Sequence, residues 1–198
     1  MAEHDLIDDA AFDAQPGAKK AAGTAIVVGG RRLTIEDVVA IAERRAPVAL
    51  SDDPAWRSRI ERGADFLRRH LASGATVYGV NTGYGDACVV DVPMDLVEAL
   101  PLQLTRYHGC GMGVHLDDAQ TLAVIAARLN SLAYGFSGVR PVLLERLADL
   151  INHRVLPRIP SEGSVGASGD LTPLSYVAFA MVGKRDVLFD GELRDASG

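Results

Sequence analysis

Apolar residues recur every three or four positions along several long segments of this chain, which is the spacing of one face of an α-helix. The segments with this spacing are 35–42, 51–74, 94–107, 117–134, 140–153 and 174–182. Pro101 interrupts the third segment, and alternating patterns typical of strands are few. The chain is therefore predicted to fold as a mainly α protein, with two long glycine-rich loops between its helices.

The clearest strand pattern lies near the N-terminus and predicts a small β-hairpin. Ala25–Val28 is a short run rich in β-branched residues, and a Gly-Gly pair forms a favourable turn before Arg31–Leu33. Thr34 and Asp37 then resemble a helix capping box in which Asp replaces the preferred Glu or Gln. A helix is therefore expected to begin directly after the hairpin.

Residues 1–24 lack sustained periodicity and are expected to form a disordered tail, so one domain is predicted over 25–198. The net charge of −6 argues against a nucleic-acid partner, which would need a basic field. The acidic N-terminus lacks a signal-peptide core, and no apolar run is long enough to span a membrane. A cytoplasmic protein without a membrane anchor is the resulting expectation.

The cysteines and histidines do not suggest a metal centre. Cys88 and Cys110 are too few and too irregularly placed for a disulfide framework or a zinc site. Four of the five histidines have no metal-ligand spacing, namely His4, His70, His115 and His153. No metal is therefore predicted.

A loop at 161–173 carries three glycines spaced three apart and admits three interpretations. One is a flexible connector in which Ser168 or Asp170 caps the next helix. The second is the phosphate cradle of a dinucleotide-binding domain, with Asp190 about 20 residues further on as its acidic partner. The spacing G-x-x-G-x-x-G disfavours this second interpretation, because that fold uses G-x-G-x-x-G.

The third interpretation is covalent chemistry within the tripeptide Ala167-Ser168-Gly169. A tight bend can bring the amide nitrogen of Gly169 onto the carbonyl carbon of Ala167, and glycine tolerates such a bend because it has no Cβ. Cyclisation with dehydration of the Ser168 side chain would leave a methylidene-imidazolone. Its exocyclic carbon is a strong electrophile, which can serve as an electron sink that ordinary side chains do not provide.

The histidine, phenylalanine and tyrosine ammonia-lyases share a signature that residues 163–174, GSVGASGDLTPL, resemble nearly residue for residue. That family usually has Ala where Thr172 stands, and often Ala-His at the positions of Ser175-Tyr176. The resemblance implies that Ala167, Ser168 and Gly169 form the family's self-made 4-methylidene-imidazol-5-one. It implies no metal or nucleotide cofactor.

A second glycine-rich loop supports the same resemblance. Residues 78–85, YGVNTGYG, are similar to the family's Tyr-Gly-Val-Asn-Thr-Gly-Phe-Gly loop. The first tyrosine of that loop is the family's catalytic base, so the resemblance assigns this role to Tyr78. Without the resemblance, a lone loop tyrosine is more often a packing residue with its hydroxyl at the surface. Residues 128–141 also resemble a family segment, which we expect to be scaffolding.

Two adjacent residues, Tyr107 and His108, stand where family members select their substrate. Histidine lyases usually have Ser-His there, tyrosine lyases His-Leu and phenylalanine lyases Phe-Leu. His108 matches the histidine-type second position, where a substrate imidazole or phenol could be hydrogen-bonded. Tyr107 matches none of the three pairs. The alternative for His108 is a structural histidine at a helix end.

The resemblance implies an ammonia-lyase that removes the α-amino group and a β-proton from an aromatic L-amino acid, with conversion of L-histidine to urocanate as the first choice. A tyrosine ammonia-lyase or an aminomutase with the same prosthetic group is an alternative. A non-catalytic fragment or a dinucleotide-binding domain is the alternative of another class. Family members are much longer homotetramers whose sites also use later residues. The chain is therefore expected to be an N-terminal portion that is inactive by itself.

Overall fold

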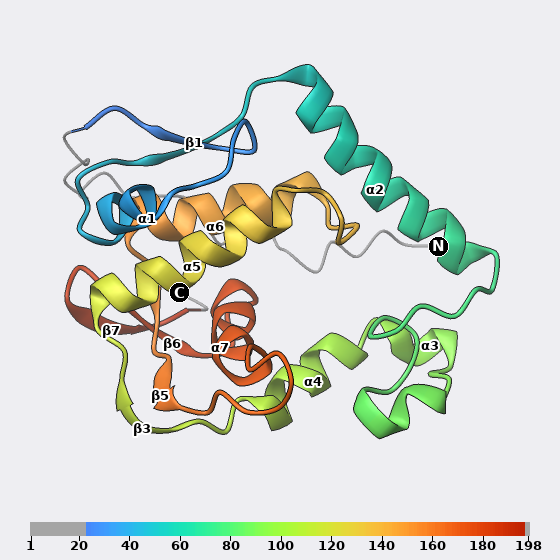
Figure 1. Cartoon of the computed structure of the whole chain (residues 1–198). Helices are drawn as coiled ribbons and strands as arrows, with labels where there is room; N and C mark the ends of the chain where they lie inside the picture. Colours follow the sequence, from blue (N-terminus) through green and yellow to red (C-terminus); the bar gives the residue numbers. More distant parts are fainter. Residues whose placement is uncertain (1–22, 197–198) are drawn as a thin grey trace.

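The computed structural model describes residues 23–196, and helices form most of its regular structure (Figure 1). Within these residues the helices are α1 (Ile35–Ala42), α2 (Pro54–Ala72), α3 (Met94–Val97), α4 (Leu100–His108), α5 (Asp118–Leu132), α6 (Pro141–His153) and α7 (Leu171–Met181). Each segment with helical spacing contains a helix, so the predicted mainly α fold is confirmed. Pro101 lies in the first turn of α4, where a missing amide is tolerated. The tail predicted over 1–24 lies outside the described residues, apart from its last two positions.

The strands are short and form three small sheets. They are β1 (Ile26–Val28), β2 (Val48–Leu50), β3 (Met112–His115), β4 (Leu156–Pro157), β5 (Pro160–Glu162), β6 (Asp186–Phe189) and β7 (Glu192–Asp195). β1 pairs with β2 in parallel, whereas β3 pairs with β5 in antiparallel orientation. β6 lies between β4 and β7 and is antiparallel to both. The sheets are small, so the helices bury much of their apolar surface against one another.

The core lies around α5 and α6, with α1 packed on α5 (Figure 1). The largest fully buried side chains from these three helices are Ile41, Leu122, Ile125, Leu129, Leu144 and Leu150. Trp56 of α2 donates a hydrogen bond from Nε1 to the Ala133 carbonyl at 2.8 Å and so ties α2 to the end of α5. Each fully buried side chain of this size contributes about 1.5–3 kcal/mol to the stability of the folded state. This core is therefore the stable part of the fold from which the loops extend. No helix within residues 23–196 is long and apolar enough to cross a lipid bilayer.

The predicted N-terminal β-hairpin is wrong. β1 pairs in parallel with β2, with Ile26 opposite Val48, and α1 makes the crossover between the two strands. Instead of turning back along β1, the chain continues into α1, and the parallel pair buries Val28 and Val48 against the helical core. The side-chain amide of Asn152 also bonds both the amide and the carbonyl of Val48, each at 2.9 Å, and fastens β2 to α6.

The predicted capping box at the start of α1 is confirmed, with Asp37 acting where Glu or Gln is preferred. The Thr34 hydroxyl accepts a hydrogen bond from the Asp37 amide at 3.2 Å, and the Asp37 carboxylate accepts one from the Thr34 amide at 2.8 Å. The guanidinium of Arg31, together with the Thr34 amide, holds the pKa of the Asp37 carboxyl well below its usual range. The helix start therefore depends on a charged Asp37.

Acid should weaken this helix start through Asp37. A carboxyl whose pKa is lowered by folding stabilises the native state above its unfolded pKa of about 3.9, and this stabilisation is lost as the pH falls through the folded pKa. Asp37→Ala should therefore lower the free energy of unfolding by about 1 kcal/mol at neutral pH. The loss should be smaller below a pH of about 3.9, where the charged carboxylate stabilises the native state less. Urea denaturation followed by circular dichroism measures both values.

The control for this prediction is Asp65→Ala, which removes an ion pair with Arg68 on the surface of α2. An exposed pair of this kind contributes about 0–1 kcal/mol, so this variant should be nearly as stable as the unsubstituted protein. An equal loss of stability for Asp37→Ala at neutral pH and in acid would contradict the role assigned to the charged carboxylate.

Candidate active site

The pairing of β3 with β5 brings two of the predicted site segments to the same end of a sheet. α4 ends at His108 and leads through 109–111 into β3, while β5 leads into the loop that carries Ala167–Gly169 and then into α7. In the antiparallel pair, Met112 at the start of β3 lies opposite Glu162 at the end of β5. α4 also packs against α7 (Figure 1). The segment that follows Tyr107 and His108 and the segment that leads to the tripeptide therefore meet at the same end of this sheet.

The tripeptide lies in a tight turn that spans residues 166–168. Ala167 and Ser168 are exposed, and Gly169 has a φ of +72°, which L-residues with a Cβ rarely adopt. A Cβ added to Gly169 would lie only 2.6 Å from Ser164 Oγ. The backbone conformation therefore favours glycine at this position, and a side chain there would also displace the Ser164 hydroxyl.

The structure bears on the two other interpretations of this loop. The loop does connect β5 to α7, and Asp170 occupies the N-cap position of α7, but no side chain caps the helix there, so the predicted cap is wrong. The strands on either side of the loop, β5 and β6, both pair in antiparallel orientation. A dinucleotide-binding domain needs a parallel βαβ unit at this point, so that alternative does not fit the fold.

Tyr78 projects from a loop that two buried polar residues hold in place. The Asn81 side chain accepts a hydrogen bond from the Val77 amide at 2.7 Å and donates one to the Ala75 carbonyl at 2.9 Å. Thr82 is only 1% exposed, whereas Tyr78 is 65% exposed. The Tyr78 hydroxyl oxygen accepts a hydrogen bond from the amide of Gly85 at 3.2 Å. The loop therefore presents the phenol outward in a defined position.

Tyr84 contacts Tyr78 and lies near Tyr107. Its ring meets that of Tyr78 edge to face, with 6.5 Å between the ring centroids. Burial raises the pKa of the Tyr84 phenol, and the nearby phenols of Tyr107 and Tyr78 raise it further. Tyr78 and Tyr107, although far apart in the sequence, therefore both lie near the half-buried Tyr84 phenol.

His108 is orientated by the last turn of α4. Its Nδ1 lies 3.0 Å from the Leu104 carbonyl oxygen, which can only accept, so Nδ1 is the donor. In the neutral ring this leaves Nε2 as the hydrogen-bond acceptor. Tyr107 is 56% exposed, and the centroid of its ring lies 4.9 Å from the centroid of the His108 ring. The pair thus presents a phenol and an acceptor nitrogen from adjacent positions.

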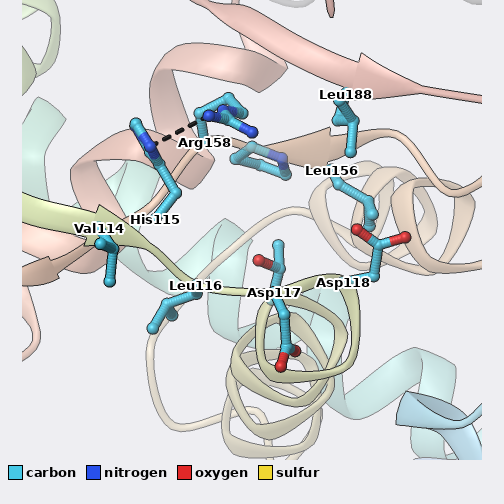
Figure 2. A pocket seen from close by; sticks show the side chains of 10 residues that line it. Val114, His115, Leu116, Asp117, Asp118, Leu156, Arg158 and Leu188 are labelled. Carbon is cyan, nitrogen blue, oxygen red and sulfur yellow. Dashed lines mark hydrogen bonds between the residues drawn. The ribbon is translucent and has the colours of Figure 1, made fainter. Parts of the chain in front are cut away.

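Two pockets lie next to β3, and neither is formed around the predicted catalytic residues. Figure 2 shows a pocket of about 420 Å³ in which Arg158 donates a hydrogen bond to His115 at 3.1 Å. The second pocket, of about 540 Å³, includes Tyr176 and Arg185 in its lining. The sequence marked Tyr176 only as a departure from the family pattern, and nothing in its local pattern distinguished Arg185.

Comparison with known proteins agrees with the motifs and the fold. Residues 33–198 match the model of the family described as aromatic amino acid lyase. The chain is 40% identical over 172 residues to a probable histidine ammonia-lyase from Thermoplasma acidophilum, covering 87% of this chain and 34% of that protein. It is 41% identical over 167 residues to an MIO-dependent tyrosine 2,3-aminomutase from Streptomyces globisporus, covering 84% of this chain and 30% of that protein.

The fold is also that of a solved member of this group. A crystal structure of tyrosine aminomutase from Streptomyces globisporus matches with a TM-score of 0.78 and 35% identity, covering 87% of this chain and 32% of that one. The chain therefore spans about a third of the length of the relatives it matches. Since the family match extends over most of its length, the chain belongs to the aromatic amino acid lyase family.

Proposed function

We propose that the complete protein is an ammonia-lyase that converts L-histidine to urocanate and ammonia. The observation that carries this proposal is the pairing of β3 with β5, which brings the segment after Tyr107 and His108 beside the start of the loop with Ala167–Gly169. Residues that select a substrate ring must lie near the electrophile that acts on the same substrate. Membership of the aromatic amino acid lyase family supports the same class of reaction.

The loop geometry fits the prosthetic group that the sequence implies. The loop turns at 166–168, and Gly169 has a left-handed backbone conformation in which a Cβ would lie 2.6 Å from Ser164 Oγ. This geometry suits a bond from the Gly169 nitrogen to the Ala167 carbonyl carbon. Formation of 4-methylidene-imidazol-5-one would release two water molecules, one of them from the Ser168 side chain. Such a group, once formed, supplies the electron sink that elimination from an unactivated amino acid requires.

The other site residues have separate tasks in this proposal. Tyr78 acts as the base in its phenolate form: its oxygen, to which the Gly85 amide donates a hydrogen bond, takes the β-proton of the substrate and becomes the phenol. Nε2 of His108 accepts a hydrogen bond from the substrate imidazole. The Tyr107 ring lies beside the His108 ring. A phenol hydroxyl could donate to the same nitrogen, so tyrosine is the second substrate to test.

Histidine turnover by the complete polypeptide tests this proposal. Formation of urocanate from L-histidine and of coumarate from L-tyrosine can both be followed by ultraviolet absorbance. We expect kcat/KM to favour histidine, and His108→Leu should lower kcat/KM for histidine by about tenfold, the effect of losing one hydrogen bond. No turnover of either amino acid would contradict the proposal and favour a non-catalytic chain.

The matched control is His70→Leu. His70 also lies in the last turns of a helix, α2, and its ring stacks on a neighbouring aromatic ring, that of Phe66, at 5.3 Å. This variant should keep the turnover of histidine and the preference over tyrosine. If His108→Leu behaves in the same way as this control, His108 is a structural histidine and the substrate assignment is wrong.

A tyrosine aminomutase is the second candidate, because the chain is 41% identical to the aminomutase from Streptomyces globisporus. Tyr107 also departs from the pairs typical of the lyases. An aminomutase would return β-tyrosine from L-tyrosine without net release of ammonia. Chromatography of the products therefore distinguishes the two candidates in the same experiment.

We also propose that the complete protein is a homo-oligomer, with a tetramer as the expected state. Several large apolar side chains of the described residues are strongly exposed, among them Met112, Val114 and Phe136. Apolar surface of this kind is often covered by other protein. Later parts of the chain or other subunits are therefore expected to cover it.

A further inference from the structure

Residues 109–111, here called the tether segment, join Tyr107 and His108, the proposed substrate-selecting pair, to β3. One end of the tether segment is bonded to α7 and the other to the turn after α7. The amide of Gly111 donates a hydrogen bond to the hydroxyl oxygen of Tyr176 at 3.0 Å. The guanidinium of Arg185 donates one to the carbonyl of Gly109 at 2.6 Å. The backbone that directly follows the substrate-selecting pair is therefore fastened to the helix that follows the tripeptide loop.

Arg185 is itself held by aromatic rings of α7. Its Cζ lies 4.2 Å from the ring centroid of Tyr176 and 5.3 Å from that of Phe179, and both rings are only 5% exposed. A planar guanidinium can lie over an aromatic face and still donate hydrogen bonds in its own plane, which a lysine ammonium cannot do in the same way. Tyr176 and Arg185 therefore act on the tether segment as one unit.

Apart from the bonds from Tyr176 and Arg185, the tether segment is held by a hydrogen bond from the Gly109 amide to the Thr105 carbonyl at 3.0 Å and by the close approach of Gly111 to Pro160. Two of its three residues are glycines, which have the widest range of backbone conformations. The strand that follows, β3, is exposed at all four positions. At Gly109 an added Cβ would lie 2.4 Å from Nη2 of Arg185, so the guanidinium fills the available space. The bonds from Tyr176 and Arg185 thus act together with the packing of α4 on α7 to fix how α4 ends relative to the helix that follows the tripeptide loop.

We propose that Tyr176 and Arg185 are positioning residues that set the orientation of Tyr107 and His108 toward the substrate ring. The inference rests on the proposed function, because it takes Tyr107 and His108 as the pair that selects the substrate. Tyr176 and Arg185 do not touch the reacting atoms in this assignment. They act through the backbone of the tether segment, which begins at the residue after His108.

Hydrogen–deuterium exchange and steady-state kinetics of the complete polypeptide test this proposal together. Tyr176→Phe keeps the aromatic ring beneath Arg185 and removes only the hydroxyl, which accepts the hydrogen bond from the Gly111 amide. Exchange in the tether segment should become about tenfold faster, the effect of losing one hydrogen bond. The kcat/KM for the preferred amino acid should fall by about tenfold, mainly through KM, because binding orientation is lost. Arg185→Lys should act in the same direction.

The matched control is Arg194→Lys, because Arg194 also lies over an aromatic ring, that of Phe189 at 5.1 Å, but on β7. It should change neither exchange of the tether segment nor kcat/KM. Unchanged exchange in Tyr176→Phe and Arg185→Lys would overturn the proposal, and so would faster exchange with unchanged kcat/KM. If the unsubstituted protein turns over no aromatic amino acid, the proposed function fails. Hydrogen–deuterium exchange then still tests whether Tyr176 and Arg185 restrain the tether segment.

Discussion

The tryptic peptide 159–184 of the complete protein should weigh about 36 Da less than its sequence requires, because formation of the imidazolone releases two waters. Ser168→Ala removes the hydroxyl that leaves as one of them. Gly169→Ala places a Cβ 2.6 Å from Ser164 Oγ in a backbone conformation with a φ of +72°. Both variants should lack the electrophile, so their kcat should fall by at least about 10³-fold, since no ordinary side chain replaces it.

Mass spectrometry and ultraviolet spectroscopy measure this result separately from turnover. The conjugated imidazolone should give an absorbance band that disappears in Ser168→Ala. Ser161→Ala changes another exposed serine of the same segment and should keep both the mass loss and the band. A peptide of full mass in the folded complete protein would refute the assignment. A loss of only about 18 Da would show that one of the two dehydrations is missing, which also contradicts the assignment.

Loss of the Tyr78 hydroxyl should have the second largest effect. Tyr78→Phe should lower kcat by about 10²-fold or more, because general base catalysis of proton removal is lost. The ring that contacts Tyr84 is retained, so the loop should keep its conformation. The mass loss at Ala167–Gly169 should be unchanged, because formation of the group does not involve Tyr78. Steady-state kinetics together with the peptide mass therefore separate a catalytic defect from a maturation defect.

Tyr84→Phe is the matched control for Tyr78→Phe. The two tyrosines belong to the same loop, and the related family loop has phenylalanine at the position of Tyr84. Burial raises the pKa of the Tyr84 phenol, which makes Tyr84 a poor candidate for a base. Turnover of Tyr84→Phe should stay close to that of the unsubstituted protein. Near-normal turnover of Tyr78→Phe would instead make Tyr78 a surface packing residue.

The helices were predictable because their signals are local. The stripe from Ser51 to Gly74 corresponds to α2, which begins at Pro54 and ends at Ala72. The capping box of α1 joins Thr34 to Asp37, only three positions further on. Hydrogen bonds and apolar contacts within a helix link residues three or four apart, so both partners appear in one short stretch of sequence. The position of a helix can then be inferred without knowledge of the rest of the fold.

Strand pairing could not be inferred in this way. A hairpin was the simplest partner for Ile26–Val28, because a tight turn followed it directly. The actual partner is Val48–Leu50, which comes after α1 and carries no local signal that distinguishes it from a loop. Its place is determined by burial of Val28 and Val48 in the helical core and by the bonds from Asn152. These contacts exist only once the helices have packed.

The candidate chemistry follows the same division. Ala167-Ser168-Gly169, Tyr78 and the Tyr107-His108 pair are each encoded in contiguous residues, so the sequence by itself is enough to recognise their motifs. The placement of the Tyr107-His108 segment relative to the tripeptide loop comes from the pairing of β3 with β5 and from the packing of α4 on α7. Arg185 lies in a polar turn without any motif, and it meets the Gly109 carbonyl only because those elements pack together. A contact between residues distant in sequence depends on the packing of the whole domain, which no local pattern records.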